Sequence, residues 1–184
     1  MAHTHGENNN KIRTAFMELY RELQPHEITV KMICGKANLA RTSFYNYYSD
    51  VYDVLESIED ELISDLKEIN RSFAFQNFHN CEKGDFHYFF TTLDYIKERQ
   101  TWFRALLNKS KDGTFIYKWK KIIRHDFAQK YHQERITLEN EALVLEMIAS
   151  AVIGVYMYWV NNLHHVTKED INREVLYRLC QDFM

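Results

Sequence analysis

The near absence of glycine and proline limits most strongly how this sequence can fold. Only five glycines and one proline occur in 184 residues, about 3% against a usual figure of about 12%. Hairpin-rich β folds need glycine at their turns, and phosphate-binding loops need it for close backbone approach. Both are therefore disfavoured, and the sequence predicts long uninterrupted helices.

Apolar residues recur at three- and four-residue spacing along almost the whole chain, as on the buried face of a helix. The predicted fold class is all-α, with about nine helices. We expect a flexible polar tail over residues 1–10, a three-helix helix-turn-helix domain over residues 11–53, and a helical domain over residues 54–184. A long helix of ~24 residues is expected from about Asp50.

The formal net charge is -3, but the charged residues are distributed unevenly along the sequence. The segment 31–49 contains Lys31, Lys36 and Arg41 and no acid, whereas residues 50–68 contain eight acids and only Lys67. A short cationic segment thus adjoins an acidic helix, and a polyanionic partner would be attracted to the first of these.

The cationic segment contains the pattern of a helix-turn-helix. Thr29 is placed to cap a first helix, and Asn38 tolerates the left-handed conformation that a tight turn requires. Phe44 and Tyr48 are four residues apart and can anchor a second helix, from Arg41 to Tyr48, in the core. The other side chains of that helix are then expected to face outward: Arg41, Thr42, Ser43, Tyr45, Asn46 and Tyr47.

These outward residues suit the major groove of DNA. Arginine can pair with guanine and asparagine with adenine, while serine and threonine can contact several base edges. Thr29, Lys31 and the tyrosine hydroxyls suit phosphates, which position a protein without reading sequence. On the pattern alone an alternative stays open, in which three small helices pack together and their polar residues are simply solvated.

The same residues resemble the DNA-binding signature of TetR-type transcriptional regulators. The resemblance covers roughly Ile12 to Leu55, and a looser one relates the following domain to regulators linked to dihydroxyacetone kinase. The matching segments are Thr29-Val30-x-x-Ile33, Ala37-x-Leu39 and Arg41 to Tyr48 for the first resemblance, and Tyr95-Ile96-Lys97, Leu106-Leu107 and Ile148 to Trp159 for the second.

The resemblance implies how such a protein binds DNA. Base or phosphate contacts would come from the second helix, and Lys31 and Tyr47 would bind backbone phosphates. Three positions depart from the family pattern: Asn38 replaces a turn glycine, Ala40 a polar cap, and Val51 a lysine that commonly meets a phosphate. Since a lost cap costs ~1 kcal/mol and a lost lysine removes one counterion-releasing contact, affinity is expected either to be modest or to depend unusually on Lys31, Lys11 and Arg13.

The helix predicted over about residues 139–163 is apolar nearly all round. Such a helix must be buried on all sides, and its small residues would allow another helix to approach closely. A buried intramolecular helix is the alternative, and a membrane span is disfavoured because the apolar run ends at Asn161-Asn162. The predicted dimer interface comprises Ala149, Ser150, Val152, Ile153, Gly154, Ile171, Val175 and Leu179.

The family resemblance also implies a small-molecule effector bound in the helical domain. Aromatic residues could line its pocket, although an aromatic stripe at helical spacing is ordinarily core. No cofactor and no metal are expected, because the histidines lack metal-ligand spacing. The candidate pocket residues are Phe86, Phe89, Phe90, Trp102, Phe103, Trp119, Tyr131 and Tyr156.

The sequence therefore predicts a DNA-binding transcriptional regulator rather than an enzyme. It is expected to be a homodimeric repressor on a near-palindromic operator, released by an effector, and cytoplasmic, since its three cysteines form no CxxC pair. The alternative is a helical dimer that acts through ligand or protein contacts, as co-regulator or activator, with weakened DNA binding. A basic run from Lys118 to Arg124 indicates either a second anion-binding surface or a solvated helix face.

Overall fold

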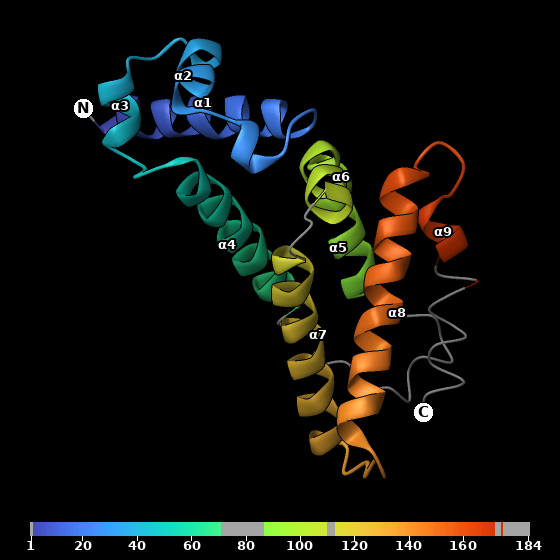
Figure 1. The fold of residues 1–184 in the computed structure, drawn as a ribbon. Coiled ribbons are helices and arrows are strands. Elements are labelled where there is room, and N and C mark those ends of the chain that lie inside the picture. The colour runs from blue at the N-terminus through green and yellow to red at the C-terminus, as the bar shows by residue number, and fades with distance from the viewer. Residues whose placement is uncertain (1, 71–86, 110–112, 172–173, 175–184) are drawn as a thin grey trace. The chain divides into compact units, whose positions relative to one another are not determined.

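The computed structural model describes residues 2–70, 87–109, 113–171 and 174. Over these residues the chain is all-α with nine α-helices, as predicted from the periodicity (Figure 1). The chain divides into two compact units, an N-terminal unit of residues 1–62 and a C-terminal unit of residues 63–184. The boundary falls inside a helix, α4 (Val51–Asn70), and lies nine residues beyond the expected one.

The N-terminal unit begins with α1 (Ala2–Tyr20), which covers most of the expected tail. Two contacts explain why residues 2–10 are helical rather than a flexible tail. Lys11 and Glu7 form an ion pair of 2.7 Å one turn apart, and the Tyr48 hydroxyl donates a hydrogen bond of 2.5 Å to Asn9 Oδ1. The second contact comes from 39 residues away in sequence, so local composition could not reveal it.

A 3-10 turn, η1 (Pro25–Glu27), leads to α2 (Val30–Ala37) and α3 (Arg41–Tyr45). Thr29 caps α2 as predicted, because its Oγ1 accepts a hydrogen bond from the amide of Met32. Asn38 ends α2 in the left-handed conformation, with φ of 53°. Ala40 precedes α3 without a side-chain cap. The α-helical part of α3 ends three residues earlier than expected, because the amide of Tyr47 bonds to the carbonyl of Phe44 in a tighter turn.

The C-terminal unit contains the end of α4 and the helices α5 (His87–Glu98), α6 (Gln100–Lys109), α7 (Thr114–Gln133), α8 (Glu141–Asn161) and α9 (Lys168–Ile171). Helix α8 packs against α5, α6 and α7, and runs alongside α7 for most of its length (Figure 1). Gly113 occupies the N-cap position of α7. At the start of α9, Thr167 and Asp170 form reciprocal hydrogen bonds between side chain and backbone amide.

Helix α8 is the one helix among the described residues that is long and apolar enough to cross a membrane. Its inner face is buried against α6 and α7 through residues such as Ile148, Val152 and Trp159. The outer face is exposed. This distribution is that of a core helix of a helical bundle with one face left exposed, and it agrees with the prediction of a buried helix rather than a membrane span.

Candidate nucleic-acid interface

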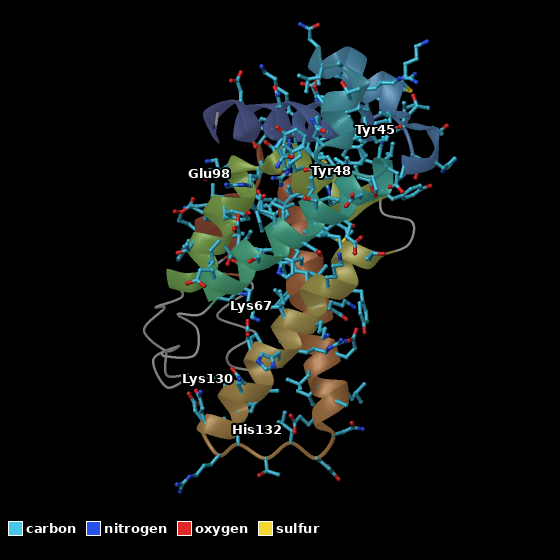
Figure 2. All side chains as sticks on the ribbon, turned by 90° about the vertical axis from the view of Figure 1, so that its left-hand side faces the viewer. Tyr45, Tyr48, Lys67, Glu98, Lys130 and His132 are labelled. Atoms are coloured by element: carbon cyan, nitrogen blue, oxygen red, sulfur yellow. The ribbon has the colours of Figure 1, made fainter. Side chains whose placement is uncertain are left out.

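Helix α3 separates an anchoring side from an exposed polar side. Phe44 is fully buried and Tyr48 is nearly so, which confirms the predicted anchors. Tyr45 is 58% exposed beside them, with its ring edge-on to Phe44 at a centroid distance of 5.5 Å (Figure 2). Arg41, Thr42 and Asn46 are exposed, and Ser43 and Tyr47 are half-buried. The polar groups predicted to contact DNA thus lie together on one short helix and the turn that follows.

Two further predicted contact residues lie at the start of α2. Lys31 is exposed, and no ion pair involves it among the described residues. Thr29 is exposed as well, but its hydroxyl oxygen already caps α2 through Met32. Lys31 is therefore available to a phosphate, whereas Thr29 also has a structural role.

Arg13 does not lie where the sequence analysis expected a phosphate-binding residue. Its side chain is buried on α1, with the whole residue only 6% exposed. Its guanidinium pairs with the Glu61 carboxylate on α4. The expected phosphate contact of Arg13 is wrong, because the acid that pairs with Arg13 lies 48 residues away in the sequence and was not apparent from the neighbouring residues. Arg13 is a charged core residue that joins two helices of the N-terminal unit.

The start of α4 carries a pair of capping carboxylates that sequence reasoning did not single out. Asp50 Oδ1 accepts a hydrogen bond of 2.9 Å from the amide of Asp53. Asp53 Oδ2 in turn accepts bonds from the amide and the hydroxyl of Ser49, at 2.8 and 3.0 Å. Two acids spaced by three residues before an apolar run are a sequence sign of this arrangement. Val51, which replaces the family's lysine, is buried.

The basic run of α7 is largely occupied by contacts within the C-terminal unit. Lys120 Nζ lies 2.8 Å from Glu146 Oε1 on α8 and also donates to the Ser150 hydroxyl. Arg124 pairs with the other oxygen of Glu146. These two cations hold the pKa of Glu146 down at about 2. Lys120 and Arg124 therefore tie α7 to α8, whereas Lys121 of the same run is exposed.

The aromatic residues proposed for a ligand pocket are mostly core residues of the C-terminal unit. Phe103 and Trp119 are fully buried, with ring centroids 5.6 Å apart, and Tyr131 and Tyr156 are nearly fully buried. Phe90 and Trp102 are half-buried. Phe86 and the side chain of Phe89 lie outside the described residues. The structure thus brings part of this set together, as a packed cluster around Trp119.

Polar atoms lie within that cluster and beside it. Trp119 Nε1 is buried and has no hydrogen-bond partner within the described part of the chain. The Tyr156 hydroxyl shares a hydrogen bond with Thr92, and burial raises its pKa. Thr92 Oγ1 donates to Asn70 Oδ1 at 3.3 Å. Asn70 also hydrogen-bonds to Asp126, whose pKa burial raises to about 6. A chain of polar side chains therefore links α8, α5, α4 and α7 inside the C-terminal unit.

The outer face of α8 presents an exposed stripe with apolar ends. Leu143, Met147 and Tyr158 are 63%, 43% and 62% exposed, and the predicted interface residues Ser150 and Gly154 lie between them on the same face. Ala149, Val152, Ile153 and Ile171 are instead buried within one chain, which removes them from the surface available to a second copy. Val175 and Leu179 lie outside the described residues.

A metal centre has no basis in the described ranges, where no group of three or more His, Cys, Asp or Glu side chains could hold an ion. Apart from the exposed stripe of α8, the polar chain and the α3 surface are two arrangements that could recognise a partner. The first could bind a small molecule and the second a nucleic acid.

Sequence comparison places the C-terminal unit among regulators. Residues 86–179, slightly more than half of the chain, match the family described as transcriptional regulator C-terminal region, TetR_C_8. The chain is 23% identical over 172 residues to YxbF of Bacillus subtilis (strain 168), an uncharacterized HTH-type transcriptional regulator. The alignment covers 90% of this chain and 43% of YxbF, so the chain spans less than half the length of that relative.

Solved structures with a similar fold include three regulators. A TetR transcriptional regulator from Streptococcus agalactiae 2603V has a TM-score of 0.69 and 21% identity, over 97% of this chain and 96% of that one. FadR of Thermus thermophilus, a repressor in complex with lauroyl-CoA, has a TM-score of 0.60 and 17% identity, over 96% and 94%. The dihydroxyacetone kinase operon activator DhaS has a TM-score of 0.54 and 19% identity, over 95% and 90%.

Proposed function

The chain belongs to the TetR family of transcriptional regulators, and from this premise we propose that it is a homodimeric repressor which binds a near-palindromic operator through α3 and is released by a small-molecule effector. The family assignment makes the chain a regulator and not an enzyme, as its sequence predicted. A DNA-binding role also implies that the protein works in the cytoplasm.

The observation that carries this proposal is the two-sided character of α3. Phe44 and Tyr48 hold the helix on the N-terminal unit, so Arg41, Tyr45 and Asn46 can be exposed without loss of packing. An exposed arginine, asparagine and tyrosine on one short helix are the groups that read base edges and bind phosphates.

Dimer formation is supported by the exposed stripe of α8. Glycine inside a helix costs ~1 kcal/mol relative to alanine, and a Cβ at Gly154 would meet no atom of the other described elements within 4 Å. Packing among the described residues therefore does not require glycine there, whereas close approach of a second α8 would. The dimer would place two α3 helices on half-sites about one DNA turn, ~34 Å, apart.

The effector site is proposed for the C-terminal unit, near Trp119 and Tyr156. Their rings offer an apolar surface, while the unpaired Trp119 Nε1 and the half-buried Asp126 offer polar contacts. By linkage, an effector that binds the released form more tightly weakens operator binding by the same factor. Lauroyl-CoA is a first probe, because the similar structure of Thermus thermophilus FadR contains it.

Selection of bound fragments from genomic DNA, followed by binding measurements, tests the proposal. Arg41→Ala and Tyr45→Ala should each weaken binding to the selected fragment at least tenfold without unfolding the protein, since a good base contact is worth about 1–3 kcal/mol. Tyr117→Ala is the matched control, because Tyr117 is a similarly exposed tyrosine on α7. Unchanged affinity in both α3 variants would refute the interface.

A second candidate function is a helical dimer that acts through ligand or protein contacts while its DNA binding is weakened. It is favoured by the absence of a side-chain cap before α3 and by the burial of Val51. DhaS, which has a similar fold, is an operon activator. Binding to the selected fragment that falls steeply with salt favours the repressor, because phosphate contacts release counterions. Absent or salt-insensitive binding favours the second candidate.

A further inference from the structure

The acids at the start of α4 lie next to the helix-turn-helix without a cationic partner among the described residues. Asp50 and Asp53 hydrogen-bond to backbone amides and to the Ser49 hydroxyl, but no described cation forms an ion pair with either. Glu18 and Glu61 differ in this respect, because Glu18 lies 2.9 Å from Lys36 and Glu61 pairs with Arg13. No described cation therefore offsets the negative charge of Asp50 and Asp53.

These carboxylates lie close to the proposed DNA-binding helix. The amide of Tyr48 bonds to the carbonyl of Phe44 on α3, and Asp50 follows Tyr48 by two residues. Two residues span at most about 7 Å, which is less than the Debye length of about 10 Å at 0.1 M salt. A phosphate beside Tyr48 would therefore be repelled by Asp50, and also by Asp53, whose charge acts on the Tyr48 hydroxyl.

The same carboxylates also occupy the positive end of α4. A helix start attracts anions through its unpaired amides and its dipole. Here the amide of Asp53 is already bonded to Asp50, and the two negative charges offset the dipole. The residue after Asp50 is the apolar and buried Val51, so this position supplies no positive charge. The start of α4 therefore offers little attraction to a phosphate.

The exposed cations of α2 and α3 lie on other parts of the unit. Lys31 lies in the first turn of α2 and Arg41 in the first turn of α3, and both are exposed. Neither forms an ion pair within the described part of the chain. The surface around the helix-turn-helix is thus cationic at the starts of α2 and α3 and anionic at the start of α4.

From this asymmetry we infer that Asp50 and Asp53 act as an electrostatic brake on DNA binding, which lowers affinity at the α4 side and leaves phosphate attraction to Lys31 and Arg41. The inference rests on the proposed DNA-binding function and adds to it a pair of affinity-limiting residues. It also gives a physical reason for weak binding that does not require a damaged recognition helix.

Asp50→Asn and Asp53→Asn test the brake with little change in structure. Asparagine caps a helix about as well as aspartate, so each variant removes one charge and keeps an oxygen that can accept the same bond. Binding of a fluorescent random-sequence 30-bp duplex reports the electrostatic part of affinity alone. At 50 mM NaCl each variant should bind about three- to tenfold more tightly than the native chain, and the gain should shrink at 300 mM as screening increases.

Glu22→Gln is the matched control, because it removes the same charge from an exposed residue beyond the C-terminal end of α1. The Asn9–Tyr48 hydrogen bond places the end of the α3 segment near the start of α1, far along the helix from Glu22. Circular dichroism and thermal melting check that every variant is folded.

The outcomes separate the brake from the proposed function. If the native chain binds the duplex and both Asp variants bind no more tightly than Glu22→Gln, the brake is refuted while DNA binding stands. If no folded variant binds the duplex even at 50 mM NaCl, the proposed DNA-binding function itself is refuted, and the brake with it.

Discussion

Trp119 on α7 stacks on Tyr156 on α8, with ring centroids 5.1 Å apart and ring planes within 13° of parallel. The pair lies at the contact of α7 with α8, and both residues are buried. It serves the core through its apolar area, and it offers a ligand one donor, the unpaired Nε1 of Trp119. These two roles can be separated by substitution.

Trp119→Ala should lower the free energy of unfolding by about 3–5 kcal/mol, because it leaves a large cavity in the core. Trp119→Phe keeps an aromatic ring and removes a buried donor that has no partner, so its cost should be clearly smaller. Urea denaturation of the two variants checks this. Equal destabilisation would mean that the indole nitrogen has a structural partner.

Gly154→Leu should convert the dimer to a monomer. A Cβ at Gly154 would have no atom of another described part of the chain within 4 Å, and Gly154 is exposed, so the folded monomer should tolerate leucine there, while two α8 helices could no longer approach each other. Light scattering coupled to size exclusion at micromolar concentration gives the mass. Gly35→Leu is a control, since its Cβ is equally unobstructed and it lies in the N-terminal unit. A native chain that is already monomeric would contradict the interface.

Asp126→Asn should stabilise the protein at neutral pH. Burial raises the pKa of Asp126 to about 6, so the folded chain keeps a proton that the unfolded chain releases near pH 4. Stability contributed by this group therefore falls as pH rises from about 4 to about 6. With allowance for solvent screening, the variant should gain roughly 1 kcal/mol at pH 7.5 and match the native chain at pH 4. Denaturation at both pH values tests this, with Glu139→Gln as an exposed control. A gain that is equal at pH 4 would exclude the assigned cause.

Lys31→Gln and Arg13→Gln should have opposite consequences. Lys31 is exposed, so its loss should weaken DNA binding and reduce the salt dependence by about one phosphate contact without affecting stability. Arg13 is buried and paired with Glu61, so its loss should destabilise the protein by about 1–3 kcal/mol and leave the salt dependence unchanged. Thermal melting and a salt series measure both. If Arg13→Gln reduced the salt dependence of DNA binding, Arg13 would have to contact a phosphate, contrary to its burial.

Local features of the N-terminal unit could be predicted because they depend on neighbouring residues. The cap of Thr29, the left-handed Asn38 and the anchors Phe44 and Tyr48 all follow from residue type and helical spacing. Arg13 and Asn9 could not be placed in this way, because their partners Glu61 and Tyr48 are distant in sequence. Burial of a cation and the ordering of an expected tail both depend on these distant contacts.

Helix α8 illustrates a different limit. Its sequence is apolar nearly all round, so periodicity cannot tell its inner face from its outer face. Only the packing of α6 and α7 reveals that Ala149 is buried whereas Ser150 is exposed. The fold class and the family were predicted from sequence and are confirmed. The DNA contacts, the dimer interface and the effector site remain predictions.

Sequence-specific DNA binding by α3 is the central proposal. Its most direct test is the ratio of the affinities for the genomically selected fragment and for a random duplex, measured for the native chain and for Arg41→Ala. We predict that the native chain prefers the selected fragment by at least about 10³-fold, and that Arg41→Ala loses at least about tenfold of this preference. A ratio near one for the native chain, or an unchanged ratio in the variant, would contradict the account.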